Sequence, residues 1–259
     1  MINENPIGLF DSGIGGTSIW KEVHALMPYE NTIYLADSKN APYGLKSKDE
    51  IIALSCKNTE FLLENNCKII VVACNTATTN AIKELRAKYN VPFIGIEPAI
   101  KPAALQSKTQ TIGILATKGT LNSELFHKSV ANHPDVKIIE QIGHGLVQLI
   151  ENGDMDSAEM EELLKSYLNP MVEKNIDYLV LGCSHYPYLI PQIKKIIPSQ
   201  IKIIDSGEAV AKQTQKILEQ NNLLNLSKRK SSQIFYTNSE PEVLKNILGN
   251  CENVIYKNF

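Results

Sequence analysis

The sequence lacks any apolar run of the ~18 residues that a membrane-spanning helix needs. Its first residues, MINENP, have neither the basic start nor the apolar core of a secretory signal peptide. These absences predict a cytoplasmic protein with no membrane partner. An excess of charge of one sign is absent too, because 26 Lys and Arg balance 28 Asp and Glu. We therefore expect no nucleic acid partner and favour a small-molecule substrate.

One basic stretch, residues 228–230, lies within the polar segment 221–232. Aromatic residues are not interleaved with its charges, as they are in surfaces that bind single-stranded nucleic acid. We interpret the segment as a solvated loop.

Close cysteine pairs are also missing, since none of the five cysteines belongs to a CxxC motif. In a reducing cytoplasm they should be free thiols. Cys56, Cys67 and Cys251 have no motif around them, and we expect them to be small buried hydrophobic residues. Cys74 and Cys183 remain as candidates for chemistry.

Cys74 and Cys183 end two similar segments, IIVVACNT at 69–76 and YLVLGCSH at 178–185. Each apolar run has the length of a strand buried on both faces of a parallel sheet, and ligands bind just past the carboxyl ends of such strands. Two thiols facing one site could remove a proton from a carbon and return one from the opposite side. The pattern predicts racemisation without a cofactor.

A competent resting state would pair one thiolate with one thiol. We expect both cysteines to stand at helix starts. Since an ordinary thiol is mostly protonated at neutral pH, the thiolate needs such a helix amino terminus or a cation such as His185 to lower its pKa.

The chain as a whole alternates strand-like and amphipathic segments, which predicts an α/β fold with mainly parallel sheets. With 43% hydrophobic residues it can form a substantial core. One strand series runs at 7–10, 32–36, 69–73 and 92–96, and a second at 111–116, 136–140, 177–181 and 201–204. Their similarity indicates an internal duplication. We expect two similar lobes related by an approximate two-fold axis, residues 1–97 plus 208–259 and residues 98–207, with the site in the cleft between them.

The segment DSGIGGT at 11–17 follows the first strand and resembles a phosphate-binding loop only superficially. Ser18 stands where the dinucleotide motif needs glycine, and no Walker lysine follows. Its carboxylate, hydroxyl and glycine turn could instead hold an ammonium group and assist a thiol. Asp11 as a simple helix cap is the alternative.

A zinc site made by Cys74, Cys183, His185 and Asp11 is a competing interpretation. Structural zinc ligands usually come in close pairs, and Cys183 with His185 is the one such pair, so we predict no metal. The other histidines, 24, 127, 133 and 144, have no catalytic context.

Six ordered motifs carry a family resemblance along nearly the whole chain: DSGIGG (11–16), PYG (42–44), VACNTA (72–77), GIEPA (95–99), LATKGT (115–120) and LGCSHYP (181–187). In these the chain resembles glutamate racemases. The resemblance implies a cofactor-independent enzyme that interconverts L- and D-glutamate, supplies D-glutamate for peptidoglycan, and usually forms a homodimer.

The resemblance also implies roles for individual residues. Cys74 and Cys183 would be the acid/base residues, assisted by Asp11 near Cys74 and by His185 near Cys183, with Glu151 as the matching assisting glutamate. Substrate binding would involve the remaining motif positions together with Asp11 and His185: Ser12, Tyr43, Gly44, Asn75, Thr76, Thr117, Thr120 and Ser184.

Three alternatives stay open. An aspartate or other amino-acid racemase of the same superfamily would use the same thiols. A one-thiol decarboxylase would not need both of them. A two-lobed amino-acid binding protein would share the architecture and need neither.

Overall fold

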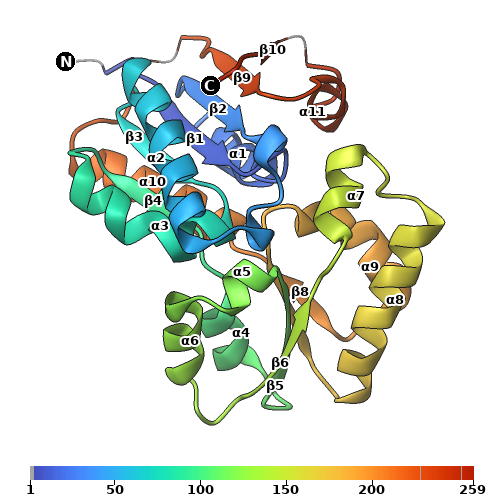
Figure 1. The fold of residues 1–259 in the computed structure, drawn as a ribbon. Helices are drawn as coiled ribbons and strands as arrows, with labels where there is room; N and C mark the ends of the chain where they lie inside the picture. The colour runs from blue at the N-terminus through green and yellow to red at the C-terminus, as the bar shows by residue number, and fades with distance from the viewer. Residues whose placement is uncertain (1–2, 228, 252) are drawn as a thin grey trace.

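The computed structural model describes residues 3–227, 229–251 and 253–259, which form two lobes, each built on a parallel sheet (Figure 1). The first lobe contains a six-stranded sheet of order β10-β9-β2-β1-β3-β4, and the second a four-stranded sheet of order β6-β5-β7-β8. The first sheet comprises β1 (Ile7–Asp11), β2 (Thr32–Ala36), β3 (Ile69–Val72), β4 (Phe93–Gly95), β9 (Gln233–Thr237) and β10 (Val254–Tyr256). The second comprises β5 (Thr111–Ala116), β6 (Lys137–Ile142), β7 (Tyr178–Gly182) and β8 (Lys202–Ile204).

Helices follow most strands, as parallel connections require. They are α1 (Thr17–Leu26), α2 (Lys48–Glu64), α3 (Asn75–Lys88), α4 (Ile100–Gln106), α5 (Lys118–Leu121), α6 (Glu124–Ala131), α7 (Leu146–Asn152), α8 (Ala158–Glu173), α9 (Ile190–Ile196), α10 (Gly207–Gln220) and α11 (Glu242–Ile247). Short 3-10 helices, η1 (Ser38–Asn40), η2 (Tyr43–Leu45) and η3 (Tyr186–Leu189), lie in the connections. Within the described ranges, no helix combines the length and the apolar character needed to cross a membrane.

Alternate residues of the central strands serve opposite faces of the first sheet. Leu9 packs in a cluster with Ile19 of α1 and Val210 of α10. Its neighbour Phe10 packs in another cluster with Leu62 of α2. All residues of β1, β2 and β3 are buried, as expected of strands covered by helices on both faces.

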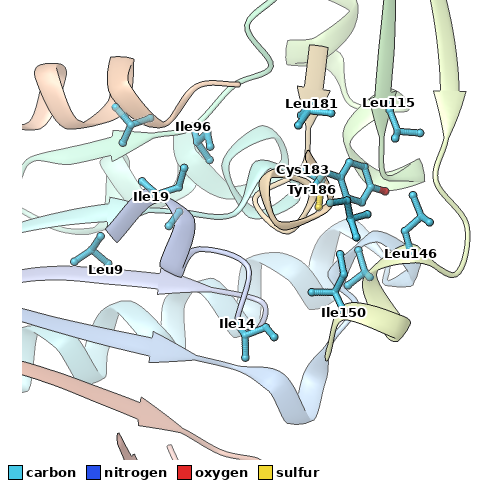
Figure 2. Close-up of a cluster of buried hydrophobic side chains, with 14 of the residues drawn as sticks. Leu9, Ile14, Ile19, Ile96, Leu115, Leu146, Ile150, Leu181, Cys183 and Tyr186 are labelled. Carbon is cyan, nitrogen blue, oxygen red and sulfur yellow. The ribbon is translucent and has the colours of Figure 1, made fainter. Parts of the chain in front are cut away.

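The cluster that contains Leu9 continues without a break into the second lobe, where it includes Leu181 and Tyr186. Figure 2 shows Cys183 and Tyr186 beside Leu146 and Ile150 in this part of the cluster. An apolar core therefore joins the lobes directly behind the second motif cysteine.

The chain passes from the first lobe to the second after β4 and returns after β8, and both the first described residues and the carboxyl terminus lie on the first lobe (Figure 1). This division of strands fits the expected segments 1–97 plus 208–259 and 98–207, whose boundaries stay a prediction. All observed strand pairs are parallel, so the predicted α/β class is confirmed.

Two features differ from the sequence-based expectations. Strands β9 and β10 and helix α11 were not predicted, although residues 234–237 are the aromatic and β-branched types common in strands. Cys56 and Cys251 are only half-buried, whereas Cys67 is buried as expected. In the polar segment 221–232 the described residues form neither helix nor strand; residue 228 lies outside them.

Candidate functional site

Asp11 ends β1 and is fully buried. Its carboxylate accepts a hydrogen bond from the backbone N–H of Gly13 at 2.9 Å and another from the Ser184 hydroxyl at 2.8 Å. Burial raises the pKa of Asp11, although nearby His185 and these hydrogen bonds act in the opposite direction. Because Ser184 belongs to the second lobe, Asp11 is a polar link across the cleft.

Cys74 follows β3 and is the N-cap of α3, as the sequence predicted. Its Sγ accepts from the backbone N–H of Ala77 at 3.4 Å and lies 3.7 Å from the Ser12 hydroxyl. Burial first, and then the charge of Asp11, raise the pKa of Cys74, while the Ala77 and Ser12 contacts oppose them. The expected lowering by the helix start is thus outweighed, and Cys74 is a protonated thiol at neutral pH.

Cys183 follows β7 but does not begin a helix, which differs from the prediction. The chain turns after it, and His185 is the residue that precedes η3. The Sγ atom of Cys183 lies 3.8 Å from Nδ1 of His185. A neighbouring imidazole, rather than a helix terminus, is therefore the feature that accompanies this thiol.

His185 is buried and is held between two acidic groups. Its Nε2 lies 2.5 Å from Oε1 of Glu151, and its Nδ1 lies 4.0 Å from Oδ2 of Asp11. Burial works against the charged ring, but the contacts with Cys183, Glu151 and Asp11 prevail and raise the pKa of His185 well above its ordinary value. Nε2 also accepts from the backbone N–H of Gly15 at 3.2 Å, while Nδ1 is directed toward the Cys183 sulfur.

Both thiols line one small cavity between the lobes. Its walls come from η2, the starts of α3 and α5, and the turn after β7: Ser12, Pro42, Tyr43, Gly44, Cys74, Asn75, Thr76, Thr117, Val147, Cys183, Ser184 and His185. The cavity volume is about 10 Å³, roughly the space of a single water molecule. Any amino acid is several times larger, so the lobes must separate for one to enter.

Asn75 and Tyr43 line the cavity in different ways. The side-chain amide of Asn75 is buried, and neither its oxygen nor its nitrogen has a hydrogen-bond partner among the described residues. A buried amide without partners is unfavourable, so a ligand that pairs with it gains stability. The Tyr43 hydroxyl is instead committed to Asp37 at 2.5 Å and accepts from Asn58, which leaves its ring and backbone for the cavity.

Hydroxyl groups join the lobes at another part of the cavity wall. Oγ1 of Thr76 in α3 lies 2.8 Å from Oγ1 of Thr117 and 3.4 Å from Oγ1 of Thr120, which cap and form the first turn of α5. The Cα of Gly44 lies so close to Thr117 that an added Cβ would be 2.9 Å from the Thr117 Cβ. These contacts close the cavity and would separate when it opens.

Most residues singled out in the sequence therefore lie at one place. Asp11, Glu151 and Thr120 do not line the cavity but contact residues that do. Pro42, Val147 and a serine in η1, Ser38, were missed. Pro42 stands within a motif and could have been found; Val147 and Ser38 carry no chemical signal of their own.

Metal binding has no geometric basis among the residues that the structure describes, where no three His, Cys, Asp or Glu side chains are arranged to hold an ion. Cys74 and Cys183 instead occupy opposite lobes, each with its own polar partners.

Known proteins resemble this chain in sequence and in fold. The family description "Asp/Glu/Hydantoin racemase" matches residues 17–214. The glutamate racemase of Herpetosiphon aurantiacus is 42% identical over 241 residues, covering 93% of this chain and 95% of that protein. The structure resembles glutamate racemase isoform RacE1 from Bacillus anthracis, with a TM-score of 0.89, 30% identity, and coverage of 99% of this chain and 98% of that one.

A further solved structure is Escherichia coli glutamate racemase in complex with L-glutamate and the activator UDP-MurNAc-Ala. It superposes with a TM-score of 0.86 at 31% identity over 98% of both chains. Matches of this identity and coverage establish an isomerase that racemises an amino acid. The chain belongs to the Asp/Glu/Hydantoin racemase family and, within it, to the glutamate racemases.

Proposed function

We propose that this protein interconverts L- and D-glutamate by proton transfer between two cysteines and the α-carbon, without a cofactor. The observation that carries the proposal is that Cys74 and Cys183, at the ends of β3 and β7 in different lobes, line the same cavity. A substrate held between them presents one face of its α-carbon to each sulfur. Relatives named as glutamate racemases, and an E. coli homologue solved with L-glutamate, support the choice of substrate.

The reaction needs no oxidant or reductant. One thiolate takes the α-hydrogen as a proton, and the C–H electron pair is delocalised into the α-carboxylate. The opposite thiol then donates its proton to the other face of the same carbon. The first cysteine ends as a thiol and the second as a thiolate, so the enzyme is ready for the reverse direction.

The surroundings of the two thiols differ in a way that suits this scheme. Cys74 stays protonated because burial and the charge of Asp11 raise its pKa. Cys183 instead has the imidazole of His185 beside it, with Nδ1 at 3.8 Å from the sulfur. We therefore assign Cys74 as the acid in one resting form, with Asp11 assisting near Cys74 and His185 near Cys183.

Recognition of the substrate falls to polar groups around the cavity. The unpartnered amide of Asn75 and the hydroxyls of Ser12, Thr76 and Thr117 are placed to bind carboxylate or ammonium groups once the lobes open. Thr120 and Ser184 hold Thr76 and Asp11, while Tyr43 and Gly44 shape the wall. Supply of D-glutamate for peptidoglycan and a homodimer stay predictions of the family resemblance, and a cytoplasmic location stays a prediction from the sequence.

The proposal is tested by incubating the purified protein with L-glutamate in deuterated buffer that contains a chelator and no pyridoxal phosphate. Circular dichroism should decay to zero while NMR shows solvent deuterium replacing the α-hydrogen. L-Aspartate in a parallel sample separates the two substrates. Turnover of aspartate alone would contradict the substrate assignment, and binding without any exchange would indicate an amino-acid binding protein.

A further inference from the structure

Glu151 lies in α7 of the second lobe, yet two groups of the first lobe hold its carboxylate. Its Oε1 accepts from the backbone N–H of Ile14 at 2.7 Å. Its Oε2 accepts from the hydroxyl of Ser38, in η1 after β2, at 2.8 Å. The fit is close, since a Cβ added at Gly13 would lie 1.9 Å from Oε1.

The same carboxylate fixes the ring of His185, because Oε1 also contacts Nε2 at 2.5 Å. Nδ1 of that ring faces the Cys183 sulfur at 3.8 Å. A continuous set of contacts thus runs from Ser38 through Glu151 and His185 to the thiol. It begins in the first lobe and ends at a cysteine of the second.

We propose that Ser38 is a positioning residue for racemisation, which orients Glu151 and through it the His185 ring that serves Cys183. This inference rests on the proposed function. Ser38 lies in none of the six motifs and does not line the cavity between the thiols.

The contact also links chemistry to closure of the lobes. The cavity is too small for an amino acid to enter unless the lobes separate. Separation removes both first-lobe donors from Glu151, so the carboxylate is held from both lobes only when they are together. A movement of the lobes would therefore break the contacts of Ile14 and Ser38, and with them the support that Glu151 gives to the His185 ring beside Cys183.

Three variants test the inference. Ser38→Ala removes the hydroxyl, Ser38→Thr keeps it on a half-buried site, and Lys39→Ala changes the exposed neighbour in the same 3-10 helix as a control. A hydrogen bond to a charged group contributes about 1.5 kcal/mol or more, so Ser38→Ala should lower kcat/KM about 10-fold. Ser38→Thr should recover most of the loss, and Lys39→Ala should equal the wild type.

Isotope effects separate positioning from general damage. One enantiomer of 2-deuterated glutamate loses its α-deuterium to Cys183 and the other to Cys74. If Ser38→Ala slows only the Cys183 step, the primary isotope effect on kcat/KM rises for one enantiomer and falls for the other. A structural defect moves both in the same direction or neither.

A double-mutant cycle with Glu151→Gln completes the test. If Ser38 acts through Glu151, adding Ser38→Ala to the Glu151→Gln enzyme should lower kcat/KM by less than about 2-fold. Additive losses, or a Ser38→Ala enzyme with wild-type kcat/KM and isotope effects, would overturn the inference. A wild-type protein that does not racemise glutamate would instead refute the proposed function itself, so the two failures are distinguishable.

Discussion

Gly15, in the turn between β1 and α1, offers a sharp test of how tightly the lobes must close. A Cβ placed there would lie 2.2 Å from Nδ1 and 2.4 Å from Cγ of His185. The imidazole is a rigid ring held by Glu151, so it has no easy way to yield. Gly15 is not in the left-handed region, so alanine is compatible with its backbone. Gly15→Ala therefore acts as a wedge between the lobes.

The magnitude follows from two opposing effects. Overpacking by one methyl group costs about 1–3 kcal/mol. The protein can relieve it by opening the lobes, and a cost of about 2 kcal/mol lowers the equilibrium constant for closing the lobes about 30-fold. Replacing glycine by alanine also lowers the conformational entropy of the unfolded chain, which stabilises the folded protein by about 0.4–1 kcal/mol. We expect kcat/KM to fall about 30-fold while Tm changes by less than about 4 °C.

Racemisation kinetics and thermal unfolding of the same preparation give both numbers. Gly207→Ala, at the start of α10, is the matched control, because the nearest atom to its added Cβ is Cγ of the exposed side chain of Glu22 at 3.0 Å, which can shift by a few tenths of an ångström. That variant should keep wild-type kinetics. Wild-type kinetics in Gly15→Ala would refute the reasoning, and a Tm loss above about 8 °C would show that the lobes cannot relieve the contact by opening.

Other parts of the molecule give further predictions. Cys74→Ser and Cys183→Ser should each lower kcat for racemisation at least 1,000-fold with unchanged far-UV circular dichroism, because a hydroxyl is a far weaker acid than a thiol. Turnover near that of the wild type in both variants would contradict the two-thiol scheme. Burial raises the pKa of Cys67 to about 12, so above pH 9 the unfolded chain releases a proton that the folded protein keeps, and stability falls with pH. Between pH 9 and pH 10.5 the free energy of unfolding, measured in urea, should fall by about 2 kcal/mol more in the wild type than in Cys67→Ala. Equal falls would show that this thiol does not contribute to the pH dependence of stability. Lys68 and Glu30 form a buried ion pair at 2.7 Å. Lys68→Met should therefore lower the free energy of unfolding, measured in urea, by about 3–5 kcal/mol without altering kcat per folded molecule. A loss below about 1 kcal/mol would mean that the remaining carboxylate of Glu30 finds another partner.

The sequence was sufficient to predict the α/β class and the two cysteine segments, for a physical reason. Strands buried on both faces must be apolar throughout, and the polar residues that follow them, such as Cys74 and Cys183, are conspicuous. Asp11 after β1 is conspicuous in the same way.

What could not be predicted depends on contacts between distant parts of the chain. The residues around Ser38 in the sequence give no sign that its hydroxyl contacts Glu151, which lies 113 positions away. Tyr43 was expected to take part in substrate binding, and the bond of its hydroxyl to buried Asp37 is visible only in three dimensions. The pKa of Cys74 rises although it caps a helix, because burial outweighs the helix terminus.

The place of β9 in the first sheet has a consequence for synthesis on the ribosome. All strands of the second sheet lie between residues 111 and 204, and so leave the ribosome before β9 does. Strand β2 pairs with β9 through five residues, Thr32–Ala36. Until residue 237 has emerged, β2 is an unpaired edge of the kind that invites association with other chains. The amino-terminal lobe is thus begun first but completed last, and premature termination before residue 233 would leave a nascent chain prone to aggregate.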